Sequence, residues 1–363
     1  MVSDYKKEFE NLISTVIKED ASDLHLAEGR QPIIRSSGFL IPLTNHPILT
    51  RQDVKGILDE LIDVSKKEIF LEKKEVDFAY YDSNKTRFRG NTFFQMGKIS
   101  IALRLVPKKI KTFEELNLPT ILETFVNRQQ GFFLVVGPTG HGKSTTLATI
   151  IEMINLQRLE HIITIEDPIE YVFESKKSIV DQREILQDTP DFHTALHGMF
   201  RQDVDVLMIG EMRTADDIST AVTAAETGHL VFSTMHTNNA AQTIERIIDS
   251  FDTRQQTQIR IQLASSLLGI FSQRLIPRVS GGLIPAVELL INNNAVANLI
   301  RENRVHEINS VIETSSDQGM IDLNRYLGDL VRAGEITIEN AYLYSQNSKG
   351  LRELLKLSML ILQ

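Results

Sequence analysis

The sequence predicts an α/β protein, in which an α+β domain precedes a phosphate-loop domain with a mostly parallel sheet. Three observations lead to this fold class. A phosphate-loop motif spans Gly137 to Ser144, apolar runs with polar ends follow it, and residues 77–106 alternate between polar and apolar side chains. The first two are typical of a nucleotide-binding α/β sheet, and the third of an antiparallel sheet.

Length and composition set the domain count and exclude several classes of protein. The 363 residues are enough for two hydrophobic cores, and we expect domains at 1–106 and 117–363 joined by a linker at 107–116. The absence of cysteine excludes disulfides, iron–sulfur clusters and thiolate zinc sites. A net charge of −9 argues against a large non-specific nucleic-acid surface, although a basic channel inside an acidic protein stays open.

The first residues, Met1 to Phe9, lack the apolar core of a signal peptide, and no apolar run is long enough to span a bilayer. We therefore expect a cytoplasmic protein with no transmembrane segment.

The N-terminal domain begins with a helix over residues 5–19, whose apolar positions recur at helical spacing. They are Phe9, Leu12, Ile13, Val16 and Ile17. Extended segments follow at 22–26 and 32–39, and Thr50 opens a second helix with a capping box to Asp53. Residues 77–106 then form the antiparallel sheet.

Three arginines of that sheet, Arg87, Arg89 and Arg104, share strands with apolar residues and so project from the polar face. They are either surface arginines or cations offered to the nucleotide of a neighbouring subunit. Residues 107–111, with three lysines and a proline, open the linker, and Thr112 to Glu115 cap the next element.

The phosphate loop reads Gly-Pro-Thr-Gly-His-Gly-Lys-Ser and lies between an apolar strand and a helix, as the motif requires. Its glycines let backbone N–H groups face phosphate oxygens at a helix N-terminus. Lys143 can place its charge between the β- and γ-phosphates of ATP, and the Ser144 hydroxyl can ligate Mg²⁺. The expected nucleotide-binding residues are Gly137, Pro138, Thr139, Gly140, His141, Gly142, Lys143, Ser144 and Thr145.

Polar residues end three further apolar runs, at 162–165, 206–209 and 230–234. Because ligands bind at the carboxyl edge of a parallel sheet, these residues should converge on the nucleotide held by Lys143. They are Glu166, Asp167, Glu211 and His236.

Gly210-Glu211 stands where many such NTPases have an aspartate after the strand, so a carboxylate pair from two strands must manage magnesium and water. Glu166 and Glu211 are the candidates for hydrolysis, with Ser144, Glu211 and Asp167 as the magnesium ligands. For each carboxylate taken alone, the alternative is an acid that simply ends a strand.

His229 and His236 are separated by about 23 Å of extended strand at about 3.3 Å per residue, so they cannot share one metal. Only His236 belongs to the nucleotide edge, where it either serves the site or caps the strand.

These residues resemble the secretion ATPases of type II secretion and type IV pili, and within them the twitching-motility retraction ATPases (PilT-like). The likeness covers nearly the whole chain. It is carried by Ser22–Leu26, the phosphate loop, an aspartate box at Ile163–Glu170, Met208–Arg213 and a histidine box at Thr227–Thr237.

The resemblance implies a PAS-like first domain, a RecA-like second domain and a homohexameric ring that hydrolyses ATP with Mg²⁺. It also implies that Glu166 and Glu211 serve hydrolysis, and that His229 and His236 belong to the active site. Arginines of the first domain would complete a neighbour's site.

A retraction role is favoured because the N-terminal extension and four-cysteine zinc site of the extension ATPases are absent. The chain departs from the family at His141, usually serine, and at Ala297, an arginine in the retraction subfamily. The implied partner is an inner-membrane pilus platform protein, with the ATPase peripheral to the cytoplasmic face of that membrane and possibly beside a paralogous ATPase.

Other functions remain open: an accessory or assembly ATPase, a nucleotide-sensing regulatory subunit, or a nucleic-acid motor. The acidic charge and the lack of tryptophan count against the nucleic-acid motor. Residues 354–362 are expected to form a packing helix, with a membrane-surface helix as the alternative.

Overall fold

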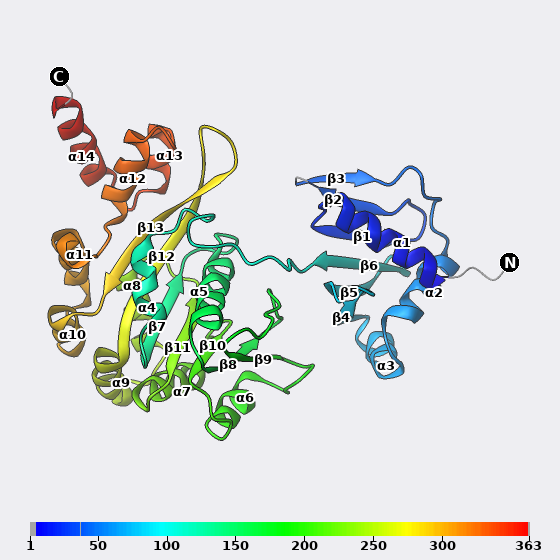
Figure 1. The fold of residues 1–363 in the computed structure, drawn as a ribbon, viewed down its shortest axis with the longest axis horizontal. Helices are drawn as coiled ribbons and strands as arrows, with labels where there is room; N and C mark the ends of the chain where they lie inside the picture. Colours follow the sequence, from blue (N-terminus) through cyan, green and yellow to red (C-terminus); the bar gives the residue numbers. More distant parts are fainter. Residues whose placement is uncertain (1–4, 37, 362–363) are drawn as a thin grey trace. The chain divides into compact units, whose positions relative to one another are not determined.

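The computed structural model describes residues 5–36 and 38–361, without the side chains of 357–361. The chain forms two compact units, Met1–Lys109 and Ile110–Gln363, which we describe separately (Figure 1). The expected linker at 107–116 spans the division between them.

The first unit is a six-stranded antiparallel sheet with three helices, α1, α2 and α3. Its elements are α1 (Tyr5–Lys18), β1 (Asp23–Ala27), β2 (Ile33–Ser36), β3 (Phe39–Pro42), α2 (Arg51–Leu61), α3 (Val64–Lys73), β4 (Glu75–Tyr81), β5 (Arg87–Gln95) and β6 (Lys98–Leu105). The strand order is β3-β2-β1-β6-β5-β4, in agreement with the alternating pattern predicted for residues 77–106.

The core of this unit joins the apolar face of α1 to α2 and to the sheet. Four of the five predicted α1 positions are buried, but Ile17 is 40% exposed because it lies at the edge of the apolar stripe. The predicted capping box is present: the Thr50 hydroxyl accepts from the Asp53 N–H, and the Asp53 carboxylate accepts from the Thr50 N–H.

The second unit begins with η1 (Thr120–Leu122) and α4 (Glu123–Val126) and is built on a seven-stranded sheet. Its strands are β7 (Gly131–Val136), β8 (His161–Glu166), β9 (Ile179–Glu184), β10 (Val206–Ile209), β11 (Leu230–Met235), β12 (Leu267–Pro277) and β13 (Leu283–Ile291). The order is β13-β12-β7-β11-β10-β8-β9, and every pair is parallel except β12 with β13.

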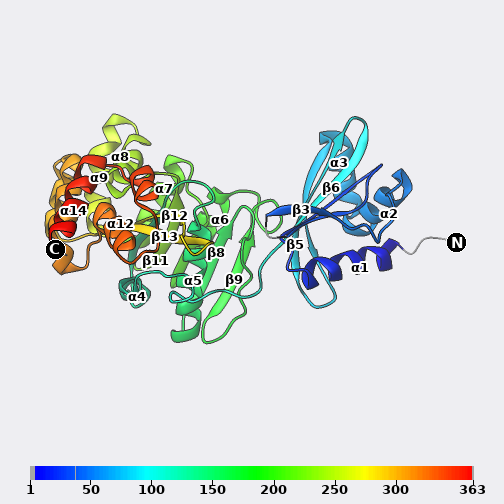
Figure 2. The same ribbon diagram turned by 90° about the horizontal axis from the view of Figure 1, so that it is seen from above.

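Helices cover both faces of this sheet (Figures 1 and 2). Along β7, Phe132 and Leu134 pack on one face, whereas Phe133 and Val135 pack on the other. The first face carries α6 (Phe192–Met199), α7 (Ala215–Glu226), α8 (Ala240–Asp249), α9 (Thr253–Ser266) and α10 (Asn294–Arg301); the second carries α4 and α5 (Lys143–Gln157). The result is the three-layer arrangement of a doubly covered parallel sheet.

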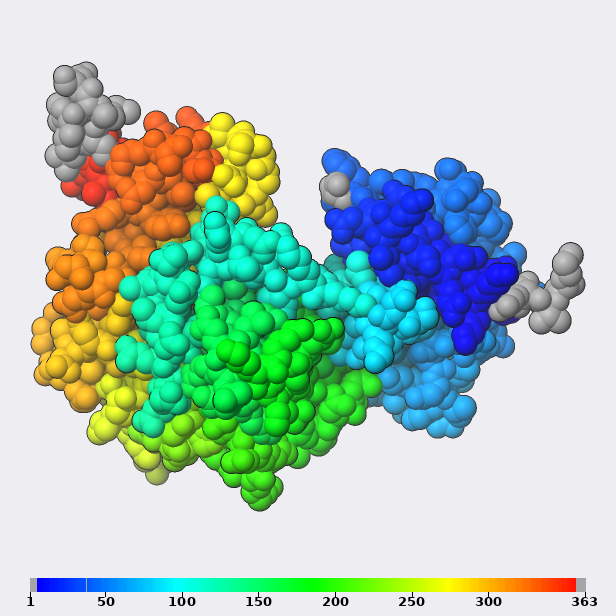
Figure 3. Space-filling model, viewed as in Figure 1, coloured from blue at the N-terminus to red at the C-terminus, as the bar shows by residue number. Residues whose placement is uncertain are grey.

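The C-terminal segment adds a small separate core against the end of the β12–β13 hairpin. This small core is formed by α12 (Leu323–Arg332), α13 (Ile338–Tyr344) and α14 (Ser348–Ile361) with the hairpin. The preceding η2 (Val305–Glu307) and α11 (Ile308–Thr314) pack on the first face of the main sheet, and η3 (Ser316–Gln318) follows them. Figure 3 shows α12 and α13, in orange, beside the yellow hairpin. Leu351 and Leu355 of α14 are buried in this core, as a packing helix requires, while the side chains from 357 onward lie outside the described residues.

Among the described residues, no helix combines the length and apolar character needed to span a bilayer.

Candidate active site

The phosphate loop joins β7 to α5, and its backbone requires glycine at two tight positions. Gly142 caps α5 with a φ of 82°, and Gly137 has a φ of 147°. A Cβ on Gly137 would lie 2.3 Å from the carbonyl oxygen of Gln273 in β12. Ser144 is exposed in the first turn of α5, while the Thr145 hydroxyl lies 2.8 Å from that of Tyr171.

The His141 side chain fastens this loop to β12. The Leu275 N–H donates to His141 Nδ1 at 2.9 Å, and Gln273 Nε2 donates to the His141 carbonyl at 2.8 Å. Burial, with the nearby cations Lys143 and Arg274, lowers the pKa of His141, so the ring is a neutral acceptor. No local pattern predicts this contact, because the partners are more than a hundred residues apart.

Lys143 is buried and folded back on its own loop. Its Nζ donates to the carbonyls of Gly137 at 2.9 Å and Pro138 at 3.0 Å. Burial lowers its pKa, and the charge of Glu211 opposes that shift. The ammonium also lies 3.2 Å from His236 Nδ1.

His236 connects the phosphate loop to the end of β10. Its Nδ1 faces the Lys143 ammonium and lies 3.3 Å from the Thr139 hydroxyl, while its Nε2 lies 3.5 Å from Glu211 Oε1. An ammonium cannot accept a hydrogen bond, so Nδ1 carries the lone pair and Nε2 the proton. The adjacent parallel strands β7, β11 and β10 thus bring Lys143, His236 and Glu211 together at their carboxyl edge.

Arg213 lies between the two expected carboxylate ligands. Its Nη2 is 3.2 Å from Glu211 Oε2, and its Nη1 is 3.6 Å from Asp167 Oδ2. The sequence motifs indicate no separate role for this arginine. Its place two residues after Glu211 was the available signal, because the short loop before α7 must return to the same edge.

Glu166 differs from Glu211 in its surroundings, since it is 4% exposed. Its carboxylate accepts from the Thr164 hydroxyl at 2.7 Å, Gln182 Nε2 at 3.2 Å and the Glu170 N–H at 3.2 Å. Burial outweighs these bonds and raises its pKa to about 7. The two acids expected to act as a pair are therefore one buried carboxyl and one partly exposed carboxylate.

His229 lies at the opposite end of β11 from His236, as the spacing predicts. Its Nδ1 is 2.9 Å from the Ala224 carbonyl, and its ring meets Phe200 edge-on at 5.6 Å. This chain by itself does not bring His229 to the phosphate loop, so its active-site role stays a prediction.

The three arginines of the first unit are not equivalent. Arg104 has an exposed side chain whose Nε donates to the buried Asp23 at 2.8 Å. Arg89 is half-buried and lies opposite Arg104 in the register of the adjacent strands β5 and β6. Arg87 is only 5% exposed and donates to the Tyr81 hydroxyl at 3.1 Å, which corrects the expectation of three solvated side chains.

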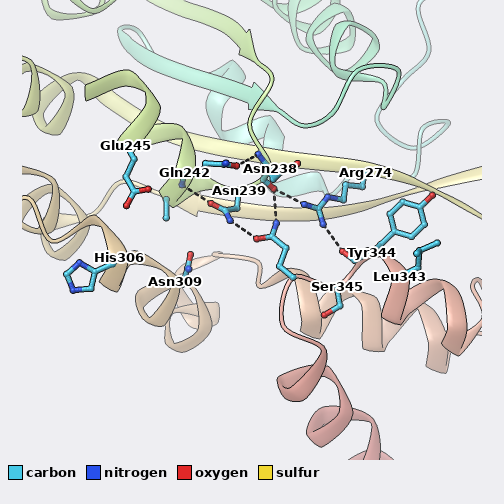
Figure 4. A pocket seen from close by; sticks show the side chains of 12 residues that line it. Asn238, Asn239, Gln242, Glu245, Arg274, His306, Asn309, Leu343, Tyr344 and Ser345 are labelled. Atoms are coloured by element: carbon cyan, nitrogen blue, oxygen red, sulfur yellow. Dashed lines mark hydrogen bonds between the residues drawn. The ribbon is translucent and has the colours of Figure 1, made fainter. Parts of the chain in front are cut away.

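A polar groove of about 680 Å³ lies where the chain leaves the site (Figure 4). The Asn238 carbonyl, two residues after His236, accepts from Ser272 Oγ at 2.9 Å, Arg274 Nη2 at 3.2 Å and Gln346 Nε2 at 2.8 Å. The C-terminal helices are thereby tied to the segment that follows His236.

Comparison with known proteins agrees with this geometry. The family described as "Type II/IV secretion system protein" matches residues 5–283. This chain belongs to that secretion-protein family. The predicted resemblance and fold class are confirmed.

Members of the secretion-protein family similar to this chain include two proteins of Pseudomonas aeruginosa. The type IV pilus retraction ATPase PilT is 41% identical over 91% of this chain and 96% of its own length. The type IV pilus ATPase PilU is 38% identical over 96% of this chain and 92% of its own.

A crystal structure of the pilus retraction motor PilT with bound ADP matches with a TM-score of 0.90 and 44% identity. The match covers 95% of this chain and 98% of the other.

Proposed function

We propose that this chain is a Mg²⁺-dependent ATPase whose turnover powers type IV pilus retraction and hence twitching motility. The convergence of Lys143, His236 and Glu211 beside the phosphate loop carries the proposal. The similarity to PilT over nearly the whole chain supports the choice of machine.

In this proposal the phosphate loop binds ATP through its backbone N–H groups and the N-terminus of α5. The γ-phosphate draws the Lys143 ammonium away from the carbonyls of Gly137 and Pro138. His236 then detects the phosphate, since its two ring nitrogens face Lys143 and Glu211. Glu211, which is partly exposed, orients the attacking water.

The donor set at this edge fits magnesium, which prefers hard oxygen ligands and keeps several waters. Ser144 offers a hydroxyl, and Glu211 and Asp167 offer carboxylates held near each other by Arg213. These three residues would hold the ion, which supplies charge neutralisation at the phosphates. Glu166 acts from its buried position as a proton-holding group beside the strand end.

At the level of assembly, we propose a homohexamer at the cytoplasmic face of the inner membrane that turns a pilus platform protein. In this proposal residues 107–111 of the linker act as the hinge, and first-domain arginines reach the nucleotide of a neighbour. Nucleic acid is not expected as a partner, given the net charge of −9.

The experiment compares Glu211→Gln with Lys143→Ala in purified protein and in cells lacking the gene. Glu211→Gln should bind ATP but hydrolyse it at least a hundredfold more slowly, because the water loses its carboxylate. Cells lacking the gene should carry more surface pili and lose surface movement. Restored movement with Glu211→Gln at normal abundance would refute the motor role.

A second candidate is an accessory ATPase, because the chain is also similar to PilU, which is named a type IV pilus ATPase without mention of retraction. For that role, deletion would leave pilus number unchanged while a paralogous ATPase continued retraction. Loss of pili on deletion would instead identify an assembly ATPase.

A further inference from the structure

Two histidines and an aspartate meet on the surface of the second unit, at the start of α7. His193 and His197 occupy positions i and i+4 of α6, and Asp216 is in the first turn of α7. One ligand atom from each of these three side chains lies within 4.8 Å of the others. In the part of the chain that the structure describes, no other such group was found.

The contacts within the cluster are close. His193 Nδ1 lies 2.5 Å from Asp216 Oδ2, and the rings of His193 and His197 are 4.4 Å apart between centroids. Helical spacing i, i+4 places both imidazoles on one face of α6, which is the spacing that metal-binding helices use. All three side chains are exposed, so an ion can reach them.

A plain ion pair does not account for the whole cluster. A charged His193 opposite Asp216 needs no second imidazole, and two protonated rings at 4.4 Å would repel each other. A divalent cation, in contrast, binds the neutral form of both imidazole rings. Ligand atoms about 2.1 Å from a tetrahedral zinc lie about 3.4 Å apart, a separation reached by small rotations of these exposed side chains.

The surrounding charge also favours a cation. Asp191, the N-cap of α6, and Asp217, in the first turn of α7, are two further carboxylates beside the cluster. Two imidazoles with one carboxylate form a donor set suited to zinc, cobalt or nickel, whereas magnesium prefers oxygen ligands alone. Water can fill the remaining positions.

We propose that His193, His197 and Asp216 bind one zinc-type dication that clamps α6 to the first turn of α7. Asp216 is five residues beyond Glu211 and three beyond Arg213, in a helix whose start is fixed by the Thr214–Asp217 capping box. The clamp therefore stabilises the segment that positions these two side chains, separately from the magnesium that accompanies ATP.

The test titrates ZnCl₂ into the nucleotide-free full-length chain by calorimetry, with thermal unfolding in parallel. The expected result is one zinc per chain, a raised unfolding midpoint, and no comparable effect of MgCl₂. His197→Ala should weaken zinc binding at least tenfold while leaving the His193–Asp216 pair intact. Cobalt(II) in place of zinc should give visible absorption bands that disappear in the same variant.

His306→Ala is the matched control, because His306 is an exposed histidine with a carboxylate, Glu307, at 3.7 Å. It should bind zinc like the wild type. Asp216→Asn and His197→Gln serve as conservative variants, and metal-free unfolding midpoints equal to wild type show that each is folded. Equal zinc affinity in wild type, His197→Ala and His197→Gln, or no zinc binding by the wild type, would overturn the proposal.

Discussion

At the residue scale, two buried carboxyls carry raised pKa values for the same physical reason. Burial raises the pKa of both Glu166 and Glu288 to about 7. Glu288, on β13, accepts a hydrogen bond from the Ala240 N–H and lies near Arg274 and Asp322. Glu166 stands at the proposed site, whereas Glu288 has no proposed part in hydrolysis. Comparing the two residues therefore shows whether a raised pKa accompanies a catalytic role or only burial.

The stability that these two buried carboxyls contribute should fall as pH rises from about 4.5 to about 7. In that window the folded protein keeps the two protons that the unfolded chain has lost, so unfolding becomes easier with rising pH. Each pKa shift changes the free energy of unfolding by about 3 kcal/mol at most. Glu166→Gln and Glu288→Gln should each be more stable than wild type at pH 8, but not at pH 4, in urea unfolding.

The same two variants should differ in hydrolysis. Glu166→Gln should lose most of its ATPase activity, while Glu288→Gln should retain it, because only Glu166 ends the strand beside Glu211. Unchanged activity in Glu166→Gln would remove that residue from the proposed mechanism and leave its pKa as a consequence of burial alone.

At the element scale, the loop between α13 and α14 holds the segment between β11 and α8. Gln346 donates to the Asn238 carbonyl at 2.8 Å and accepts from Asn239 Nδ2 at 2.5 Å. Asn239 is the N-cap of α8, and His236 is the first residue of this segment. The C-terminal helices can therefore affect hydrolysis without touching the nucleotide.

Gln346→Ala should lower the ATPase rate several-fold while leaving ATP affinity near normal, because the segment after His236 loses two hydrogen bonds. Gln318→Ala is the matched control: its side chain also accepts from an N-cap asparagine, Asn293 of α10, but not near His236. The ATPase rate and the ATP affinity of both variants should be measured. Equal rates in the two variants would show that the contact has no catalytic consequence.

At the scale of the whole molecule, the first unit has cations but no chemistry of its own. Of the three candidate arginines, Arg104 has an exposed side chain, although it must leave Asp23 to act elsewhere. The proposed ring would bring such a cation to a neighbour's ATP, where fingers of this kind contribute roughly 10³-fold or more in rate.

Mixing inactive Arg104→Ala with inactive Lys143→Ala should then restore part of the ATPase activity, because some interfaces combine an intact arginine with an intact phosphate loop. Arg35→Ala is the control, since Arg35 also lies near Asp23, at 3.7 Å, without being a candidate. Mass measurements must show mixed rings. If mixed rings stay inactive, Arg104 does not act between subunits; Arg89→Ala tests the next candidate in the same way.

The sequence by itself determined what is encoded over short distances along the chain. The phosphate loop, the polar ends of β8, β10 and β11, the Thr50–Asp53 capping box and the separation of His229 from His236 all follow from local spacing and strand or helix period. Parallel strands then necessarily bring their carboxyl ends to one edge.

Only the tertiary structure decided which distant side chains meet, and how deeply each is buried. Three contacts join separate elements: the hydrogen bond from the Leu275 N–H to His141, the ion pair of Arg104 with Asp23, and the cluster of His193, His197 and Asp216. Burial likewise divided Glu166 from Glu211 and removed Arg87 from solvent. Packing fixes these features, because local sequence specifies an element's period and ends but not the neighbours against which it lies.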